Sequence, residues 1–174
     1  MTERTGKRNG MTLSYKRAVP EDLDLLVETR IEVLRAANLL DSSVEMPEVA
    51  AQARAYYRRA LADGSHIAYM VFDGPRLAGT GGVSFFQVLP TYHNPTGRKA
   101  YIMNMYTRPA YRRRGIAGTV LDLLVSAAKE AGIAAISLEA TDMGRPLYER
   151  YGFVGMEHEM ELPEQRSPAE SPKE

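Results

Sequence analysis

Three arginines and a glycine in a row, at residues 112–115, form the stretch of the sequence best suited to binding an anion. Residues 101–107 have strand character and residues 116–131 have the apolar spacing of a helix, so the stretch is expected at a strand-to-helix turn. The first turn of a helix carries unpaired backbone N–H groups and the positive end of the helix dipole. Because Gly115 has no side chain and Ala117 a small one, an anion could approach the main chain closely. The turn therefore predicts a diphosphate site.

The composition of the chain excludes several classes of function. Lys plus Arg (22) equal Asp plus Glu (22), so no overall field would draw the protein to nucleic acid or to an anionic membrane. A solvated basic corner remains the alternative for the three arginines. With no cysteine and three scattered histidines, the sequence has neither a catalytic thiol nor the spacing of a zinc site. We expect no bound metal.

A fourth arginine, Arg30, stands in an unusual place. Residues 20–37 are expected to form a helix, and Arg30 falls within its apolar stripe. An arginine that faces a core needs a partner. Two alternatives are open: an ion pair within the protein, or contact with a carboxylate of the substrate.

The surrounding pattern predicts an α/β fold with one domain at residues 11–162, between a flexible leader at 1–10 and a disordered tail at 163–174. A strand, a helix and a strand within residues 101–140 should form a right-handed crossover with parallel strands. The polar loop at 91–99 is a candidate substrate loop. Strands are expected at 13–18, 66–72, 77–88, 101–107, 133–140 and 153–162, and helices at 20–37, 47–62, 116–131 and 146–151.

Two segments resemble motifs of one superfamily. Residues 112–117 (RRRGIA) are similar to the acyl-CoA pyrophosphate motif R/Q-x-x-G-x-G/A of the GNAT N-acetyltransferases. Residues 147–153 (LYERYGF) are similar to their LYExxGF signature, and the expected order of elements agrees over residues 13–162. The resemblance implies the GNAT fold, a mixed central sheet of six to seven strands flanked by about four helices and splayed between strands four and five.

The resemblance also implies acetyl-CoA as co-substrate. The amides of 113–118 would hold its pyrophosphate, and the strand around 105–107 would run beside pantetheine. Thr141 stands where many members have asparagine and can make one hydrogen bond. The implied binding residues are Met105, Tyr106, Thr107, Arg112, Arg113, Arg114, Gly115, Ile116, Ala117, Gly118 and Thr141.

Tyr148 matches the general acid of the superfamily. A phenol is a reasonable proton donor to a departing thiolate. The base is less defined, because the strand at 101–107 has no acidic residue. Glu139 is the first candidate, since an acid within a buried strand needs a function or a partner. Asp142, which could instead cap a helix, and His93 are alternatives, and an acceptor that binds as a neutral amine needs no base.

The sequence is thus interpreted as an acetyl-CoA-dependent N-acetyltransferase that acts by direct attack in a ternary complex. The expected acceptor is the amine of a small molecule, with Arg30, His93 and Asn104 as candidate acceptor residues. A protein N-acetyltransferase and a non-catalytic acyl-CoA-binding module are the alternatives. Residues 1–10 lack the apolar segment of a signal peptide or anchor, so we expect a cytoplasmic protein with no nucleic-acid or membrane partner. The resemblance allows a homodimer.

Overall fold

A computed structural model of the chain describes residues 3–8, 11–157 and 159–162. The chain divides into two compact units, Met1–Glu139 and Ala140–Glu174. The first unit holds a mixed sheet and the second a short helix, and we describe each by itself. The expected tail at 163–174 lies outside the described residues.

The sheet has six strands within the described residues, in the order β1-β2-β3-β4-β5-β6. Neighbours from β1 to β5 are antiparallel, and β6 is parallel to β5. This confirms the predicted mixed α/β sheet of six to seven strands. The strands are β1 Glu3–Arg8, β2 Met11–Arg17, β3 His66–Asp73, β4 Arg76–Gln87, β5 Arg98–Thr107 and β6 Ala135–Leu138.

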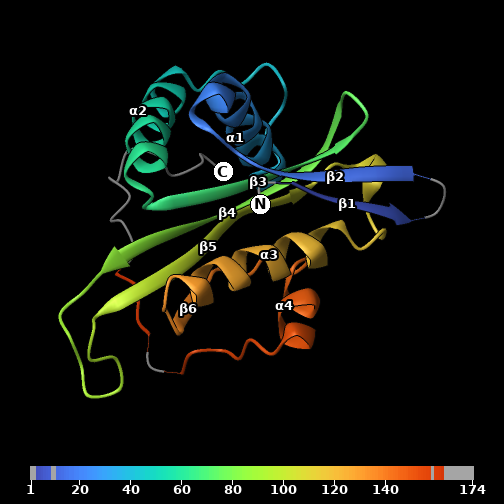
Figure 1. Cartoon of the computed structure of the whole chain (residues 1–174). Coiled ribbons are helices and arrows are strands. Elements are labelled where there is room, and N and C mark those ends of the chain that lie inside the picture. Colours follow the sequence, from blue (N-terminus) through green and yellow to red (C-terminus); the bar gives the residue numbers. More distant parts are fainter. Residues whose placement is uncertain (1–2, 9–10, 158, 163–174) are drawn as a thin grey trace, which may run out of the picture. The chain divides into compact units, whose positions relative to one another are not determined.

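Helices cover both faces of the sheet in the first unit (Figure 1). Helices α1 (Leu23–Ala37) and α2 (Pro47–Asp63) pack on one face, and α3 (Ile116–Glu130) packs on the other. The proline at the start of α2 and the left-handed glycine that follows it, Gly64 with φ 74°, explain its limits. Together with the short helix α4 (Arg145–Tyr151), these make the four α-helices of the described residues, as predicted.

Two segments differ from the sequence expectations. Glu3–Arg8, within the expected flexible leader, forms β1, because the edge of β2 offers backbone partners whatever the side chains are. Conversely, no strand forms in the described residues of 153–162. Alternating apolar residues form a strand only where a sheet edge pairs with them, and the sheet ends at β6. The limits of the predicted domain at 11–162 stay a prediction.

β5 contains a bulge. Before it, the odd-numbered residues of the strand face α1 and α2, and after it the even-numbered residues do. Gly82 is opposite Met103 and Thr80 is opposite Tyr106, so two residues of β5, Asn104 and Met105, share a single partner position. Asn104 has a left-handed backbone with φ 57°. A bulge of this kind bends a strand and redirects its side chains.

The contacts on either side of the bulge show the reversal. Met103 receives a weak hydrogen bond from Ser84 on the α2 face (3.8 Å), and the adjacent Asn104 contacts α1 on the same face. Met105 lies on the α3 face, because a Cβ on Gly81 would be 2.6 Å from both its sulfur and Val120 Cγ1. The face toward α1 and α2 therefore presents two consecutive residues of β5.

β5 and β6 are paired over only part of their length. Their register runs from Lys99 opposite Ala135 to Ile102 opposite Leu138. β5 then continues to Thr107 without a partner strand on this side. The strands that the sequence analysis numbered four and five are these two, and their pairing ends as the predicted splay requires.

The second unit is organised around α4 (Arg145–Tyr151). The carbonyl oxygen of Thr141 accepts hydrogen bonds from Gly144 N (3.0 Å) and Arg145 N (2.9 Å) at the start of this helix. Gly152, with φ 113°, ends it. No helix in the described parts of the chain has the length and apolar character needed to cross a membrane.

Candidate active site

The arginine-rich segment forms a tight turn between a single 3-10 turn (Pro109–Tyr111) and α3. Arg113 and Gly115 both have left-handed backbones, with φ 59° and 77°. This conformation is costly for Arg113 and natural for glycine. The side chain of Arg112 is tied back by a hydrogen bond from Nε to Thr107 O (3.1 Å), and the guanidinium of Arg114 lies 5.8 Å from the ring centre of Tyr111. The contacts of Arg112 and Arg114 thus hold an exposed turn whose backbone is strained.

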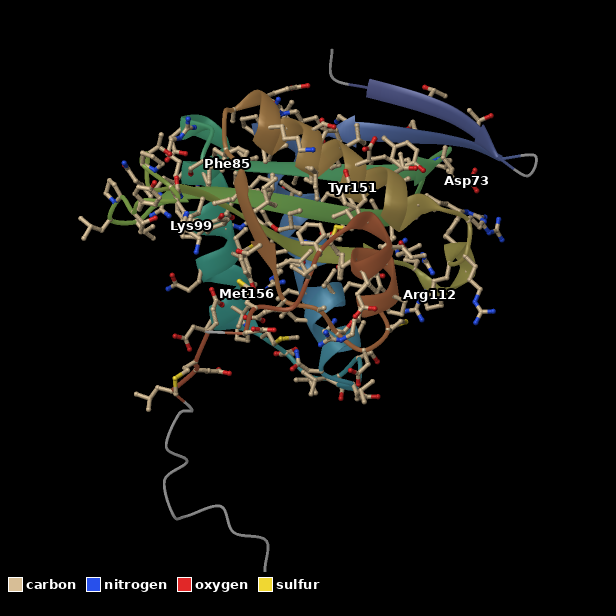
Figure 2. All side chains as sticks on the ribbon, turned by 90° about the horizontal axis from the view of Figure 1, so that it is seen from below. Asp73, Phe85, Lys99, Arg112, Tyr151 and Met156 are labelled. Carbon is tan, nitrogen blue, oxygen red and sulfur yellow. The ribbon has the colours of Figure 1, made fainter. Side chains whose placement is uncertain are left out.

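The backbone amides of residues 116–118, at the end of this turn, are available for an anion. Thr119 N donates to Gly115 O (3.1 Å), whereas the amides of residues 116–118 donate to no backbone carbonyl within the described part of the chain. This is the expected state of the first turn of a helix. Figure 2 shows that Arg112, in this turn, lies at the opposite end of the sheet from Lys99, which lies at the start of β5. The turn therefore has the donors, and at Gly115 and Gly118 the open main chain, that a pyrophosphate requires.

The open end of β5 leads directly to this turn. The predicted pantetheine strand, Met105 to Thr107, lies beyond the last pair with β6. The backbone groups of an unpaired strand edge can bind an extended ligand as another strand would. Thr107 also has a buried hydroxyl oxygen without a hydrogen-bond partner among the described residues. An extended polar ligand would fit this edge.

Two of the three candidate acceptor residues lie together. Arg30 on α1 donates from Nη1 to Asn104 Oδ1 at 3.0 Å. Both are half-buried, and the bulge explains why Asn104 faces this helix. His93 is elsewhere, exposed in the loop after β4 with its ring 5.2 Å from that of Tyr92.

A salt bridge that the sequence analysis missed joins α1 to the end of β5. Arg108 Nε and Nη2 donate to the two carboxylate oxygens of Glu32 at 2.9 and 2.7 Å, and Nη1 donates to Leu77 O at 3.0 Å. These hydrogen bonds from Arg108 lower the pKa of Glu32 from its usual value, and burial raises the pKa of Tyr106 nearby. The pair fixes the residue that leads from β5 into the turn. Its partners are 76 residues apart, a separation at which no single-sequence pattern links them.

A buried cluster of His66, Ser84 and Tyr56 was also not predicted from the sequence. His66, 2% exposed, has Nδ1 at 3.0 Å from Ser84 Oγ and 3.1 Å from Tyr56 Oη. Its Nε2 is buried without a partner among the described residues. Burial lowers the pKa of His66 to about 4, so the ring is neutral at physiological pH. A histidine at the start of an apolar strand was the only signal for it in the sequence.

In the second unit, Tyr148 is 8% exposed and packs edge-on against Phe153, with ring centres 6.1 Å apart. Burial raises the pKa of Tyr148, so its hydroxyl keeps its proton at neutral pH. Gly144 lies against it, since a Cβ there would be 3.0 Å from Tyr148 Cε2 and 3.3 Å from Thr141 Oγ1. Two residues of the predicted site, Thr141 and Tyr148, therefore lie on either side of Gly144.

Glu139 differs from its prediction. β6 ends at Leu138, so Glu139 lies just outside the strand, and it is exposed. The strand is shorter than expected because its pairing with β5 stops at Ile102. The argument that a buried acid needs a function therefore does not apply to Glu139. Asp142 is exposed too.

Comparison with known proteins agrees with this geometry. The model of the acetyltransferase (GNAT) family matches residues 31–153. No match was found among curated proteins. A predicted acetyltransferase from Clostridium acetobutylicum, solved with acetyl-CoA, is 34% identical over 87% of this chain and 96% of that one, with a TM-score of 0.79.

Two further solved structures share the fold. A GCN5-related N-acetyltransferase from Ralstonia eutropha is 28% identical over 87% of this chain and 97% of that one, with a TM-score of 0.73. An aminoglycoside acetyltransferase from an uncultured soil sample, in complex with sisomicin, is only 14% identical over 89% and 97% of the two chains, with a TM-score of 0.67. The family model and the 34% identity to the clostridial protein decide the assignment: this chain belongs to the GNAT acetyltransferase family.

Proposed function

We propose that this protein transfers an acetyl group from acetyl-CoA to the primary amine of a small molecule, by direct attack in a ternary complex. The observation that carries the proposal is the run of backbone amides at residues 116–118, which donate to no backbone carbonyl in the described structure and lie in the turn that follows the open end of β5. The clostridial relative bound to acetyl-CoA supports the choice of acyl donor.

The residues of the first unit fit acetyl-CoA as the acyl donor. The amides of 113–118 would receive the pyrophosphate, with Arg112, Arg113 and Arg114 adding positive charge around it. The open edge of β5 from Met105 to Thr107 would receive the amides of pantetheine. In the second unit, the exposed hydroxyl of Thr141 would add one hydrogen bond.

Acetyl-CoA would supply an activated thioester carbonyl. The amine nitrogen forms a bond to the carbonyl carbon, the carbon–sulfur bond breaks, and the amine loses one proton while the CoA sulfur gains one. We assign the donated proton to Tyr148, whose raised pKa keeps its hydroxyl protonated. We assign the amine proton to Glu139, whose exposed position allows water to carry the proton to it.

Calorimetry with acetyl-CoA tests the proposal directly. We expect binding in the micromolar range and little binding of pantetheine, which lacks the pyrophosphate. Gly115→Val should weaken binding by at least about tenfold, because valine does not tolerate φ 77° and places a side chain at the turn. Gly155→Val is the matched control, since its site is open, with no atom within 4 Å of an added Cβ.

Each outcome has a distinct meaning. Equal affinity of the Gly115→Val variant would refute the pyrophosphate site. Binding of acetyl-CoA with no release of free thiol from any amine would indicate a non-catalytic acyl-CoA-binding module. Acetylation of peptides but not of small amines would indicate a protein acetyltransferase.

A further inference from the structure

Arg30 occupies a position that normally belongs to an apolar residue. It follows Leu26 and Val27 by one helical turn and precedes Val33, and these three are 1%, 5% and 7% exposed. Its side chain is therefore directed from α1 toward the sheet, where it reaches Asn104. A cation held at such a position normally has a compensating anion.

Within the described residues, Arg30 has no such anion. No carboxylate oxygen of these residues lies within the 4.0 Å limit of a salt bridge to it. Glu32, the acidic residue two positions after Arg30, uses both of its carboxylate oxygens to accept hydrogen bonds from Arg108. The internal ion pair, one of the two alternatives open for Arg30, is therefore absent from the described structure.

The partner that Arg30 does have is neutral. Asn104 Oδ1 accepts one hydrogen bond, from Nη1, while a guanidinium offers five N–H donors in a planar fork. The bond fixes the orientation of the fork without neutralising it. Asn104 holds this position only because the bulge in β5 gives it a left-handed backbone and turns it toward α1.

The surroundings favour a small, singly charged anion. Tyr57 of α2, 4% exposed, lies close enough for the charge of Arg30 to act on its hydroxyl. Arg108, the next cation on this side of β5, is already neutralised by Glu32. One unpaired positive charge matches a carboxylate, whereas a phosphate dianion would need a second cation.

We propose that Arg30, oriented by Asn104, binds a carboxylate group of the acceptor, so that the acceptor is an amino acid or another amine that carries a carboxylate. The inference rests on the proposed acetyl transfer and adds the class of acceptor. Arg30 is then a specificity residue, which attracts the carboxylate end of the acceptor while the amine reacts.

Paired acceptors provide the test. Free-thiol release would be measured with acetyl-CoA and a panel of amino acids, each beside its amide, which keeps the amine but lacks the charge. At least one amino acid should exceed its amide by about tenfold to a hundredfold in kcat/KM, the range expected for a charge-assisted hydrogen bond. Arg30→Met should remove this ratio through KM, with a much larger loss for the amino acid than for its amide.

Two variants control for indirect effects. Arg58→Met, which removes an exposed arginine of α2, should keep the ratio of the unaltered protein. Asn104→Ala should reduce the ratio without abolishing it, because the guanidinium keeps its charge but loses its orientation. Equal losses for acid and amide in Arg30→Met would overturn the inference and assign Arg30 a structural role.

A second measurement separates this inference from the proposed function. Calorimetry of the same panel with the CoA-loaded protein detects carboxylate-dependent binding even where turnover is slow. Acetyl-CoA binding with a preference for neutral amines, or with no carboxylate-dependent binding or turnover at all, would overturn the inference alone. Failure to bind acetyl-CoA would refute the proposed function first.

Discussion

Acidification should unfold this protein partly through His66. The ring is 2% exposed, and its pKa falls from 6.5 to about 4 because burial disfavours the charged form. Between these two values the unfolded chain binds more protons at this site than the folded one. The contribution of the neutral His66 ring to the free energy of unfolding is therefore present above pH 6.5 and declines as the pH falls toward 4.

The size of the effect follows from the two pKa values. Lowering the pH to about 5 should cost roughly 2 kcal/mol of the free energy of unfolding, and the loss should approach about 3 kcal/mol near pH 4. Such a loss is a large part of the stability of an ordinary domain, about 5–15 kcal/mol.

Urea unfolding followed by circular dichroism at several pH values between about 8 and 5 would measure the loss, above the main titration of exposed carboxylates. His66→Gln should flatten the pH dependence, because the amide does not titrate. His93→Asn is the matched control and should keep the slope, since His93 is exposed.

Equal slopes in the His66→Gln variant and the unaltered protein would refute this reasoning. If the variant does not fold, NMR titration of the His66 ring in the unaltered protein gives an independent answer. A midpoint near the ordinary value of about 6.5 would show that burial does not hold the ring neutral.

Three further predictions concern other parts of the fold. Gly82→Ala should cost about 1–3 kcal/mol, measured as a lower melting temperature, because its Cβ would lie 2.7 Å from His66 Nε2; an unchanged melting temperature would contradict the packing. Glu32→Gln should cost roughly 1 kcal/mol in urea unfolding at neutral pH, since the pair with Arg108 is partly exposed. Because the pKa of Glu32 is lowered, this difference should vanish as the pH falls below its usual value of 4.5, and a constant difference would contradict the role of the charge. Tyr148→Phe should lower kcat by about a hundredfold or more with acetyl-CoA affinity unchanged, and full activity would remove the assigned acid role.

The sequence predicted the elements that depend on local signals. Pro47 and Gly64 mark the ends of α2, and the left-handed Gly115 marks the start of α3. The apolar stripe of α1 correctly placed Arg30 toward the core. These features follow from backbone geometry and from helical periodicity, which a single chain reveals.

The features that were missed depend on distant pairing. Glu139 lies outside β6 because β5 diverges after Ile102, which no pattern within residues 133–140 indicates. The period of two cannot reveal a bulge, so nothing in the sequence indicates that Met103 and Asn104 share one face of β5. The contacts of Arg108 and His66 likewise join elements that only the folded sheet brings together.

The bulge in β5 acts as a phase shift in the strand, and this limits which changes of length the protein can accept. Deleting Asn104 would remove the bulge and restore a regular ladder with β4, and Tyr106 would keep its present face opposite Thr80. Arg30 would then lose the side chain to which it donates. Deleting one residue after the bulge instead would move the following side chains of β5 to the opposite face, and Arg108 would leave Glu32. Compensation would require a second change of one residue before the turn at 112–115. A segment transplanted from another acetyltransferase into β5 must therefore match its bulge as well as its length.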